Sequence, residues 1–199
     1  MLLILVLSIL AYVLGSTPWG LIISRAFCGI DPRTAGSHNT GATNVSRLCG
    51  FGWGVFTLFC DIAKGMVPVI LAMLDSSSAA GISIVALSAV LGHVFSCFMG
   101  FRGGKAVATS IGVCLPIAFV PTLISCILCL LVIWRTRFVS LGSLTLLGSL
   151  PVVLILCGAF EWVPLALCLF VLVAYRHREN IARLRAGKEN RFSLSRSKH

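Results

Sequence analysis

The chain has 199 residues, of which 58% are hydrophobic and only 11% are charged, and its mean hydropathy is +1.01. A soluble domain carries about 25% charged residues, so this composition excludes an ordinary soluble globule. The net charge of +10 would suggest nucleic acid binding in a soluble protein. In so apolar a chain it indicates membrane orientation and an anionic lipid or substrate instead, with no nucleic acid partner.

Six apolar runs divide the sequence, and several exceed the 18 or so residues that indicate a membrane span. The first run lacks a basic leading region and an obvious small-residue cleavage site, so it predicts a retained span rather than a signal peptide. Together the runs predict an all-α integral membrane protein with a single membrane domain over residues 1–199. The runs are 1–24, 52–74, 79–101, 106–134, 138–160 and 162–175.

The run 106–134 is long for one span and short for two, and the distribution of charge decides between these readings. A single crossing would place the arginines after it and the basic tail outside, against the positive-inside rule. Two short segments, of about 11 and 14 residues and broken near Pro116 and Pro121, leave fifteen of the sixteen basic residues cytoplasmic. The sixteenth, Lys64, lies within a span. We therefore predict seven transmembrane or partly re-entrant helices, with the amino terminus outside and the carboxyl terminus cytoplasmic.

A basic segment follows the last apolar run. Residues 176–191 predict an interfacial helix that touches lipid headgroups, with Gly187 as its stop signal. Residues 192–199 predict a disordered tail.

Seven of the nine cysteines lie in or beside apolar runs, where the side chain behaves as a small hydrophobic group. Cys126 and Cys129 form a C-x-x-C, but no second pair or histidine completes a metal site. We therefore expect inert packing. The seven are Cys60, Cys97, Cys114, Cys126, Cys129, Cys157 and Cys168.

Three predicted cytoplasmic stretches concentrate glycine, polar side chains and positive charge. The first, DPRTAGSHNTGATNVSR at 31–47, combines flexible glycines, small hydrogen-bonding side chains and two arginines. This composition suits a cradle of N–H and hydroxyl groups for an oxyanion, and the alternative is a polar loop held by Asx-turns. The candidate residues are Gly36, Ser37, Asn39, Gly41, Thr43, Asn44 and Arg47.

The second stretch, 92–112, places Gly103 and Gly104 before Lys105 and the start of an apolar helix. Free N–H groups at a glycine-flanked helix start favour an anion. The alternative is a positive flank with hinge glycines. His93 precedes them, and a lone histidine there is more often a hydrogen-bonded structural residue than a catalyst.

The third stretch, 175–189, places His177 and Asn180 three residues apart on one helical face among arginines. Glu179 and Glu189 are expected to pair with these arginines rather than to act as bases.

Asp61 and Lys64 are also three residues apart, within a span, where charge is costly unless it is paired. We expect an intrahelical ion pair that lines the site, and a proton or ion pathway is the alternative. Ser143 has two open readings, since its hydroxyl can face the same pocket or bond its own helix.

These features alone leave three functions open: an enzyme acting on anionic lipid substrates, a small anion or phosphate-ester transporter, and a structural subunit that binds anionic lipid. The sequence contains no carboxylate cluster typical of a metal site, no G-x-S-x-G elbow and no His-x4-Asp acyltransferase signature. An acyl transfer reaction here would need a donor that is already activated.

Four segments in order resemble the bacterial glycerol-3-phosphate acyltransferases that use acyl phosphate, the PlsY family. They are GSTPWG at 15–20, the stretch 31–47, GHVFSCFMGFRGGKAVAT at 92–109 and YRHRENIARLRAGKE at 175–189. One departure is His38, where the family pattern has glycine, so the backbone there is expected to differ locally.

The resemblance implies a multi-pass enzyme of the bacterial inner membrane with its active site on the cytoplasmic side. It implies transfer of an acyl group from acyl phosphate to glycerol 3-phosphate, without a cofactor or metal. The expected partners are these two substrates, membrane lipid and the soluble enzyme that makes acyl phosphate. By resemblance Ser37, Arg47, His177 and Asn180 serve catalysis, Gly103, Gly104 and Lys105 bind glycerol phosphate, and Glu189 supports integrity.

Overall fold

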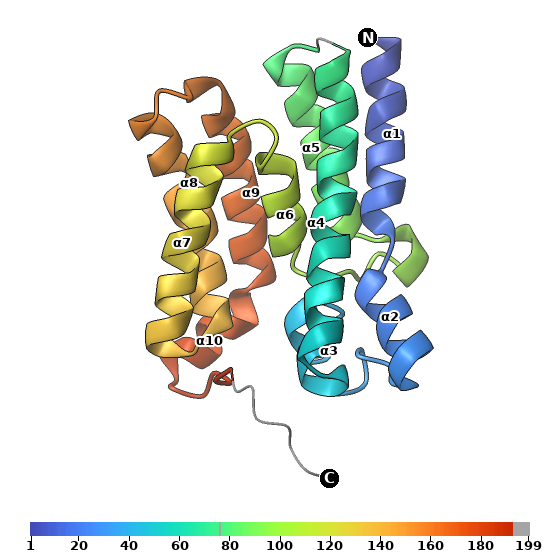
Figure 1. Cartoon of the computed structure of the whole chain (residues 1–199), viewed down its shortest axis with the longest axis vertical. Helices are drawn as coiled ribbons and strands as arrows, with labels where there is room; N and C mark the ends of the chain where they lie inside the picture. Colours follow the sequence, from blue (N-terminus) through green and yellow to red (C-terminus); the bar gives the residue numbers. More distant parts are fainter. Residues whose placement is uncertain (76, 193–199) are drawn as a thin grey trace. The chain divides into compact units, whose positions relative to one another are not determined.

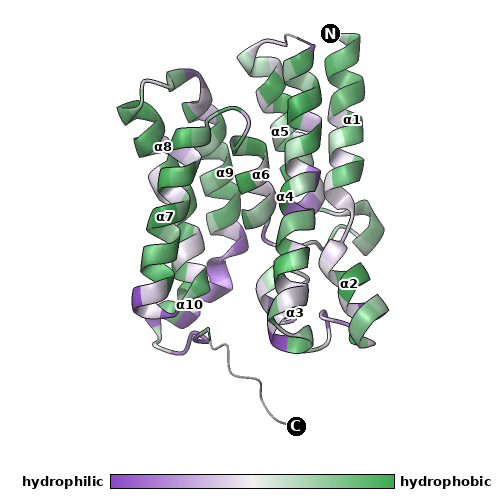
Figure 2. Ribbon diagram, viewed as in Figure 1, coloured by the Kyte–Doolittle hydropathy of each residue, from purple (hydrophilic) through white to green (hydrophobic). Residues whose placement is uncertain are grey.

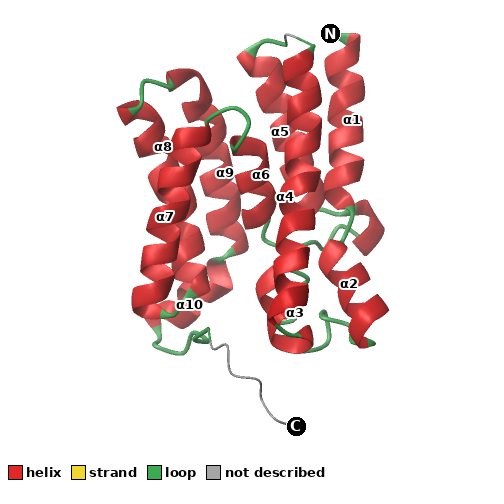
Figure 3. Cartoon of the chain, viewed as in Figure 1, coloured by secondary structure: helices red, strands yellow, loops and turns green. Residues whose placement is uncertain are grey.

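A computed structural model describes residues 1–75 and 77–192, and every regular element in these residues is a helix (Figures 1 and 3). The all-α prediction is confirmed for this part of the chain. Contacts divide it into two compact units, Met1–Val113 and the described residues from Cys114 onward, and each is described by itself below.

The first unit is built on three long apolar helices. Helix α1 packs against α5 and α4, and the short α3 lies on α4. Thr17 and Pro18 interrupt the first apolar stretch, so that α2 follows α1 after a two-residue break. In chain order the elements are α1 (Leu2–Ser16), α2 (Trp19–Cys28), α3 (Ala42–Cys49), α4 (Phe51–Leu74), α5 (Ala79–Val94), the 3₁₀ turn η1 (Cys97–Met99) and α6 (Val107–Cys114).

Small residues bring α1 and α5 into close contact. A Cβ atom on Gly15 would overlap the backbone of Ala89, and one on Gly92 would overlap the carbonyl oxygen of Tyr12. The Tyr12 hydroxyl donates to the carbonyl oxygen of Phe95 at 2.6 Å. Small residues at helix interfaces let membrane helices approach closely enough for dense packing, and this contact fixes the end of α5 that carries His93.

The second unit packs α8 between α7 and α9. Leucines fill its core, and α10 contacts both α8 and α9. The chain bends by 63° between Phe160–Arg176 and Arg178–Arg185. The elements are α7 (Phe119–Thr136), α8 (Val139–Leu156), η2 (Phe160–Trp162), α9 (Val163–Arg176) and α10 (Arg178–Arg185).

Five helical stretches of the described chain are long and apolar enough to cross a membrane, and the bent pair of α9 and α10 makes a sixth candidate. Figure 2 shows the long helices mostly green, with hydrophilic colour around α10 and in a patch on α4. The number of crossings and their orientation stay predictions. The five are Leu2–Cys28, Phe51–Leu74, Ala79–Met99, Phe119–Thr136 and Val139–Leu156.

The break predicted within 106–134 is present, because α6 ends at Cys114 and α7 begins at Phe119. The break includes Pro116, as expected, but the lengths of the two helices differ: they have 8 and 18 residues instead of about 11 and 14. At about 1.5 Å per residue, α6 extends only about 12 Å and cannot cross a bilayer core by itself.

The basic segment after α9 forms a helix over Arg178–Arg185. Gly187 has φ +66° and ends it, as expected from the sequence. The Phe192 amide donates to the carbonyl oxygen of Arg137 at 2.7 Å. The rest of the tail that the sequence predicts to be disordered lies outside the described residues.

Candidate active site

The side chain of Asn44 organises the first polar stretch. It is buried in the first turn of α3, and its Oδ1 accepts the Ser37 amide at 2.8 Å. Its Nδ2 donates to the carbonyl oxygens of Pro32, Ala35 and Asn39 at 2.9 to 3.1 Å. The 31–41 loop is thus wrapped around one amide group. The Asx-turn reading of this stretch therefore has structural support, because Asn39 Oδ1 also accepts the Gly41 amide at 2.9 Å.

Two residues of this loop have left-handed backbone conformations. Gly36 has φ +64°, and a Cβ atom there would overlap Oδ1 of Asn44. His38 has φ +54°, and its Nδ1 lies 3.1 Å from the carbonyl oxygen of Arg33. Glycine adopts this region without steric cost, so His38 holds a backbone conformation that glycine would also accept.

Asp31 anchors the start of the loop. Its carboxylate lies 2.7 Å from Nη2 of Arg33 and 2.7 Å from Nη2 of Arg25 on α2. Hydrogen bonds from Arg33, with a further one from Arg25, hold the pKa of Asp31 well below its usual range. Asp31 is therefore ionised throughout the physiological range and fixes the loop to the end of α2.

A small recess in the first unit joins the first and second stretches. Its charged lining is the pair Asp61 and Lys64, whose Oδ1 and Nζ atoms lie 2.8 Å apart with both side chains buried. The intrahelical ion pair predicted from the sequence is therefore present. Lys64 Nζ also donates to the carbonyl oxygen of Thr17, at the break between α1 and α2, at 2.8 Å. Other lining residues include Trp19, Thr40, His93, Gly103 and Gly104.

His93 connects this ion pair to the glycine turn. Its Nδ1 lies 3.0 Å from Oγ1 of Thr109 on α6 and 3.8 Å from Oδ1 of Asp61. Its carbonyl oxygen accepts the Gly104 amide at 3.1 Å, and the carbonyl oxygen of Val94 accepts the Gly103 amide at 3.0 Å. His93 is hydrogen-bonded, as the structural reading predicts, and it also lines the recess.

The amides of Gly103 and Gly104 thus donate within the chain, and α6 begins only at Val107. They are not the unused donors that a glycine-flanked helix start predicts. Their lack of side chains has another use, because a Cβ atom on Gly103 would overlap the carbonyl oxygen of His93 and one on Gly104 would overlap its Nε2. The close fit positions Lys105, which follows directly.

In the second unit, His177 lies at the bend between α9 and α10 and is only 2% exposed. Its Nδ1 is 2.8 Å from the carbonyl oxygen of Val173. Since a carbonyl can only accept, Nδ1 carries a proton, and the acceptor of the neutral ring is Nε2. Ser143 is buried on α8, and its hydroxyl donates to the carbonyl oxygen of Val139 at 2.9 Å, which is the own-helix reading.

Glu189 ties the basic segment together. Its Oε1 accepts from Asn180 at 2.6 Å, and its Oε2 accepts from Arg183 at 2.8 Å. The expected pairing of Glu189 with an arginine is confirmed. Burial opposes ionisation of Glu189, but the hydrogen bonds from Asn180 and Arg183 outweigh it and lower the pKa of the carboxyl group. The ionised form therefore fixes Asn180 next to His177.

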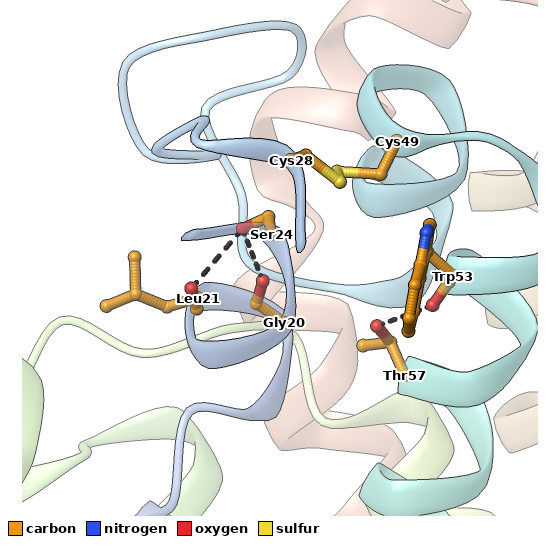
Figure 4. Close-up of a disulfide and its surroundings, with 7 residues drawn as sticks. All are labelled: Gly20, Leu21, Ser24, Cys28, Cys49, Trp53 and Thr57. Atoms are coloured by element: carbon orange, nitrogen blue, oxygen red, sulfur yellow. Dashed lines mark hydrogen bonds between the residues drawn. A yellow bond between two sulfur atoms is a disulfide. The ribbon is translucent and has the colours of Figure 1, made fainter. Parts of the chain in front are cut away.

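Sequence reasoning missed a disulfide between Cys28 and Cys49, the last residues of α2 and α3 (Figure 4). Only their position on either side of the first polar stretch was visible in the sequence, and cysteines 21 positions apart carry no pairing signal by themselves.

Residues 5–187 match the model of a family described as glycerol-3-phosphate acyltransferase. A glycerol-3-phosphate acyltransferase of Desulfovibrio desulfuricans is 64% identical over 95% of this chain and 85% of its own length. The fold matches the crystal structure of PlsY, an integral membrane glycerol 3-phosphate acyltransferase, in its glycerol 3-phosphate form, with a TM-score of 0.91, 39% identity and 96% of both chains covered. The lysophosphatidic acid form matches with a TM-score of 0.89, 37% identity and the same coverage.

Proposed function

Because the chain belongs to the glycerol-3-phosphate acyltransferase family, we propose that it transfers a fatty acyl group from acyl phosphate to glycerol 3-phosphate. The products are 1-acyl-glycerol-3-phosphate and inorganic phosphate. The observation that carries the proposal is the match over nearly the whole chain to a PlsY structure in acceptor-bound and product-bound forms. Acyltransfer to glycerol 3-phosphate follows from the family, and acyl phosphate as the donor is the finer part of the proposal.

The protein is a multi-pass integral membrane protein. We infer that it lies in the inner membrane with seven helical segments, the amino terminus outside and the active site at the cytoplasmic face. The charge distribution supports this orientation, because it places almost every basic residue on one side. In this arrangement α6 is the short, incomplete crossing, and neighbouring protein must shield its ends.

The proposed reaction is a single displacement. A glycerol 3-phosphate hydroxyl attacks the acyl carbonyl carbon, the bond from that carbon to the phosphate oxygen breaks, and phosphate leaves with the electron pair. A mixed anhydride is already activated, so no covalent enzyme intermediate is required. The protein's contribution is to hold two anions together in the correct orientation, through proximity and fixed positive charge.

Arg47 and Lys105 offset the repulsion between the two anionic substrates in this mechanism. The loop from Gly36 to Asn44, with Ser37 and Thr43 at its surface, cradles one phosphate. Asn44 acts by shaping the loop, because its amide is occupied by four loop groups. His93 acts similarly on the second stretch: its carbonyl oxygen accepts the Gly104 amide in the turn that Lys105 follows, and its ring lies near the pair of Asp61 and Lys64.

His177 contacts the second substrate, and Asn180 orients His177 or the attacking hydroxyl. The Ser143 hydroxyl donates to Val139, so its part in this site is to accept from a substrate hydroxyl. Two bases can accept the hydroxyl proton, namely Nε2 of neutral His177 and a substrate phosphate oxygen. We favour the phosphate, whose second pKa of about 6 suits proton transfer near neutral pH.

The test uses the purified full chain in detergent or vesicles with acyl phosphate and glycerol 3-phosphate. We expect lysophosphatidate and one phosphate released per acyl group. Parallel reactions supply acyl-CoA or acyl carrier protein thioester, and an Arg47→Ala variant serves as the impaired control. Product from thioesters but not from acyl phosphate would overturn the proposed donor, and no product from any donor would overturn the proposed activity.

A further inference from the structure

The disulfide between Cys28 and Cys49 closes a covalent ring of chain that includes the first polar stretch, 31–47. Cys28 ends α2 and Cys49 ends α3, and their Cα atoms are 5.9 Å apart, within the range that a disulfide spans. The ring contains Ser37 and Arg47, two of the proposed catalytic residues. Figure 4 shows the bridge with Trp53 of α4 nearby.

Both helices are also held without the bridge. The Phe27 ring, next to Cys28, stacks on Trp53 of α4 with centroids 4.1 Å apart. Helix α3 packs on α4 where Gly54 lies against Ser46 so closely that a Cβ atom would overlap the serine side chain. Separation of the two sulfurs therefore leaves α2 and α3 in place on α4. Without the bridge, the loop that joins them is held by noncovalent contacts such as those of Asn44 and the ion pair of Asp31 with Arg25.

The two cysteines lie in different surroundings from the buried cysteines of the described chain. Both are half-buried at helix ends beside a polar loop, whereas Cys114 and Cys129 are buried within apolar helices. Intracellular disulfides are uncommon, and those that form are usually transient, catalytic or redox-sensing. In the proposed orientation this pair faces the cytoplasm, where thiols and disulfides exchange.

We propose that Cys28 and Cys49 form a thiol–disulfide exchange site that controls the mobility of the 31–47 stretch, with a low-molecular-weight disulfide as its oxidant and a dithiol as its reductant. The effect on substrate affinity rests on the proposed function of the loop. The bridged form holds the loop in its binding conformation, and the dithiol form lets it open.

The exchange is balanced in two steps. The thiolate of one cysteine attacks a sulfur of the external disulfide, which forms a mixed disulfide and releases one thiolate. The thiolate of the second cysteine then attacks the first cysteine's sulfur, which forms the protein disulfide and releases the second thiolate. The two protein thiols are oxidised, the external disulfide is reduced to two thiols, and the released thiolates take up the two protons.

The experiment treats the full-length protein with glutathione disulfide or with dithiothreitol. Alkylation and peptide mapping should find Cys28 linked to Cys49 in the first sample and both alkylated in the second. On reduction, amides in 31–41 should exchange hydrogen several-fold faster while those of α4 stay unchanged. The KM for a phosphate-bearing substrate should rise several-fold with a smaller change in kcat.

Variants separate this site from general thiol effects. The double variant Cys28→Ser, Cys49→Ser should behave as the reduced protein in both samples. Cys97→Ser, which changes an exposed cysteine outside the disulfide, should respond like the unmodified chain. The reversible dithiothreitol treatment provides the comparison without substitution if the double variant folds poorly.

Absence of the Cys28–Cys49 link after oxidation would overturn the proposal. A link that leaves amide exchange and KM the same in the oxidised and reduced protein would overturn it as well, because the bridge would then have only a structural role. Mapping and exchange do not require turnover. A chain that shows the redox-dependent exchange but makes no product retains the exchange site, and the proposed function alone fails.

Discussion

The ring of His93 occupies the space that a side chain at position 104 would need. A Cβ atom on Gly104 would overlap Nε2 of His93, and the carbonyl oxygen of the same histidine accepts the Gly104 amide at 3.1 Å. His93 therefore fixes the backbone of the turn through its carbonyl oxygen, and its ring leaves room only for glycine at position 104. The ring is in turn placed by Thr109 and lies near Asp61.

Gly104→Ala should raise the KM for glycerol 3-phosphate about tenfold, with a smaller effect on kcat. Overpacking costs about 1–3 kcal/mol, and displacement of the turn moves Lys105. Steady-state kinetics with varied glycerol 3-phosphate measure both constants. Gly52→Ala, in α4 with open space around it, should leave KM unchanged. An unchanged KM in Gly104→Ala would show that this fit does not position the substrate.

Asp61→Asn should lower thermal stability strongly. The substitution leaves the buried ammonium group of Lys64 without its carboxylate partner, and breaking such a pair costs about 3–5 kcal/mol. Thermal unfolding in detergent measures the loss. The paired change Asp61→Leu, Lys64→Met removes both charges and should recover most of the stability. If both variants had the same melting temperature as the unmodified chain, the ion pair would have no structural role.

Asn44→Ala should abolish the order of the 31–41 loop and lower kcat/KM by on the order of tenfold or more. It leaves the Ser37 amide and three carbonyl groups without their partner, and each buried unsatisfied group costs about 1–3 kcal/mol. Hydrogen exchange over the loop and steady-state kinetics report the two effects. Thr34→Ala, at an exposed hydroxyl of the same loop, is the matched control and should change neither.

Glu189→Gln should loosen the basic segment and remove an acid-sensitive part of its stability. Because hydrogen bonds lower the pKa of Glu189 below its ordinary value of 4.5, the ionised group stabilises the folded state above pH 4.5. That contribution is lost as pH falls through the lowered pKa. Proteolysis of the segment between pH 7 and pH 3 tests this. A variant whose cleavage follows the unmodified protein at every pH would contradict the assignment.

His177→Ala should raise KM more than it lowers kcat, and the acid limb of the pH–kcat profile should stay near the substrate phosphate pKa of about 6. The reason is that the phosphate is the proposed base, while Nε2 of His177 is proposed to bind substrate. Arg178→Ala, at an exposed neighbour, provides the comparison. Loss of turnover with intact substrate binding would instead identify His177 as the base.

The sequence predicted most of the helices and the broken run, because apolar length, two prolines and basic flanks each leave a local trace. It placed the break near Pro116, where the structure has it, but it did not show how closely Gly65 and Gly112 let α4 and α6 approach. A Cβ atom on Gly65 would lie 2.5 Å from the carbonyl oxygen of Thr109, and one on Gly112 would overlap that of Ile62. Such contacts join distant parts of the chain and leave no local pattern.

The candidate residues were visible as residue types, but several of their detailed interactions were not. Gly103 and Gly104 suggested unused amide donors, whereas tertiary contacts with His93 and Val94 engage both amides. Asn44 appeared to be one polar residue among many, yet it is the centre of the loop. Spacing along the chain cannot distinguish a group that meets a ligand from one that holds the backbone.

The close packing of α1 against α5 predicts which inactive mutants a genetic screen will recover. A methyl group at Gly15 or Gly92 has no room, because each position faces the backbone of the opposite helix. A screen for loss of acyltransferase activity should recover substitutions at these two glycines alongside those of Ser37 and Arg47. The two classes will differ in the amount of protein that accumulates in the membrane, so an inactive allele by itself does not identify a residue of the reaction.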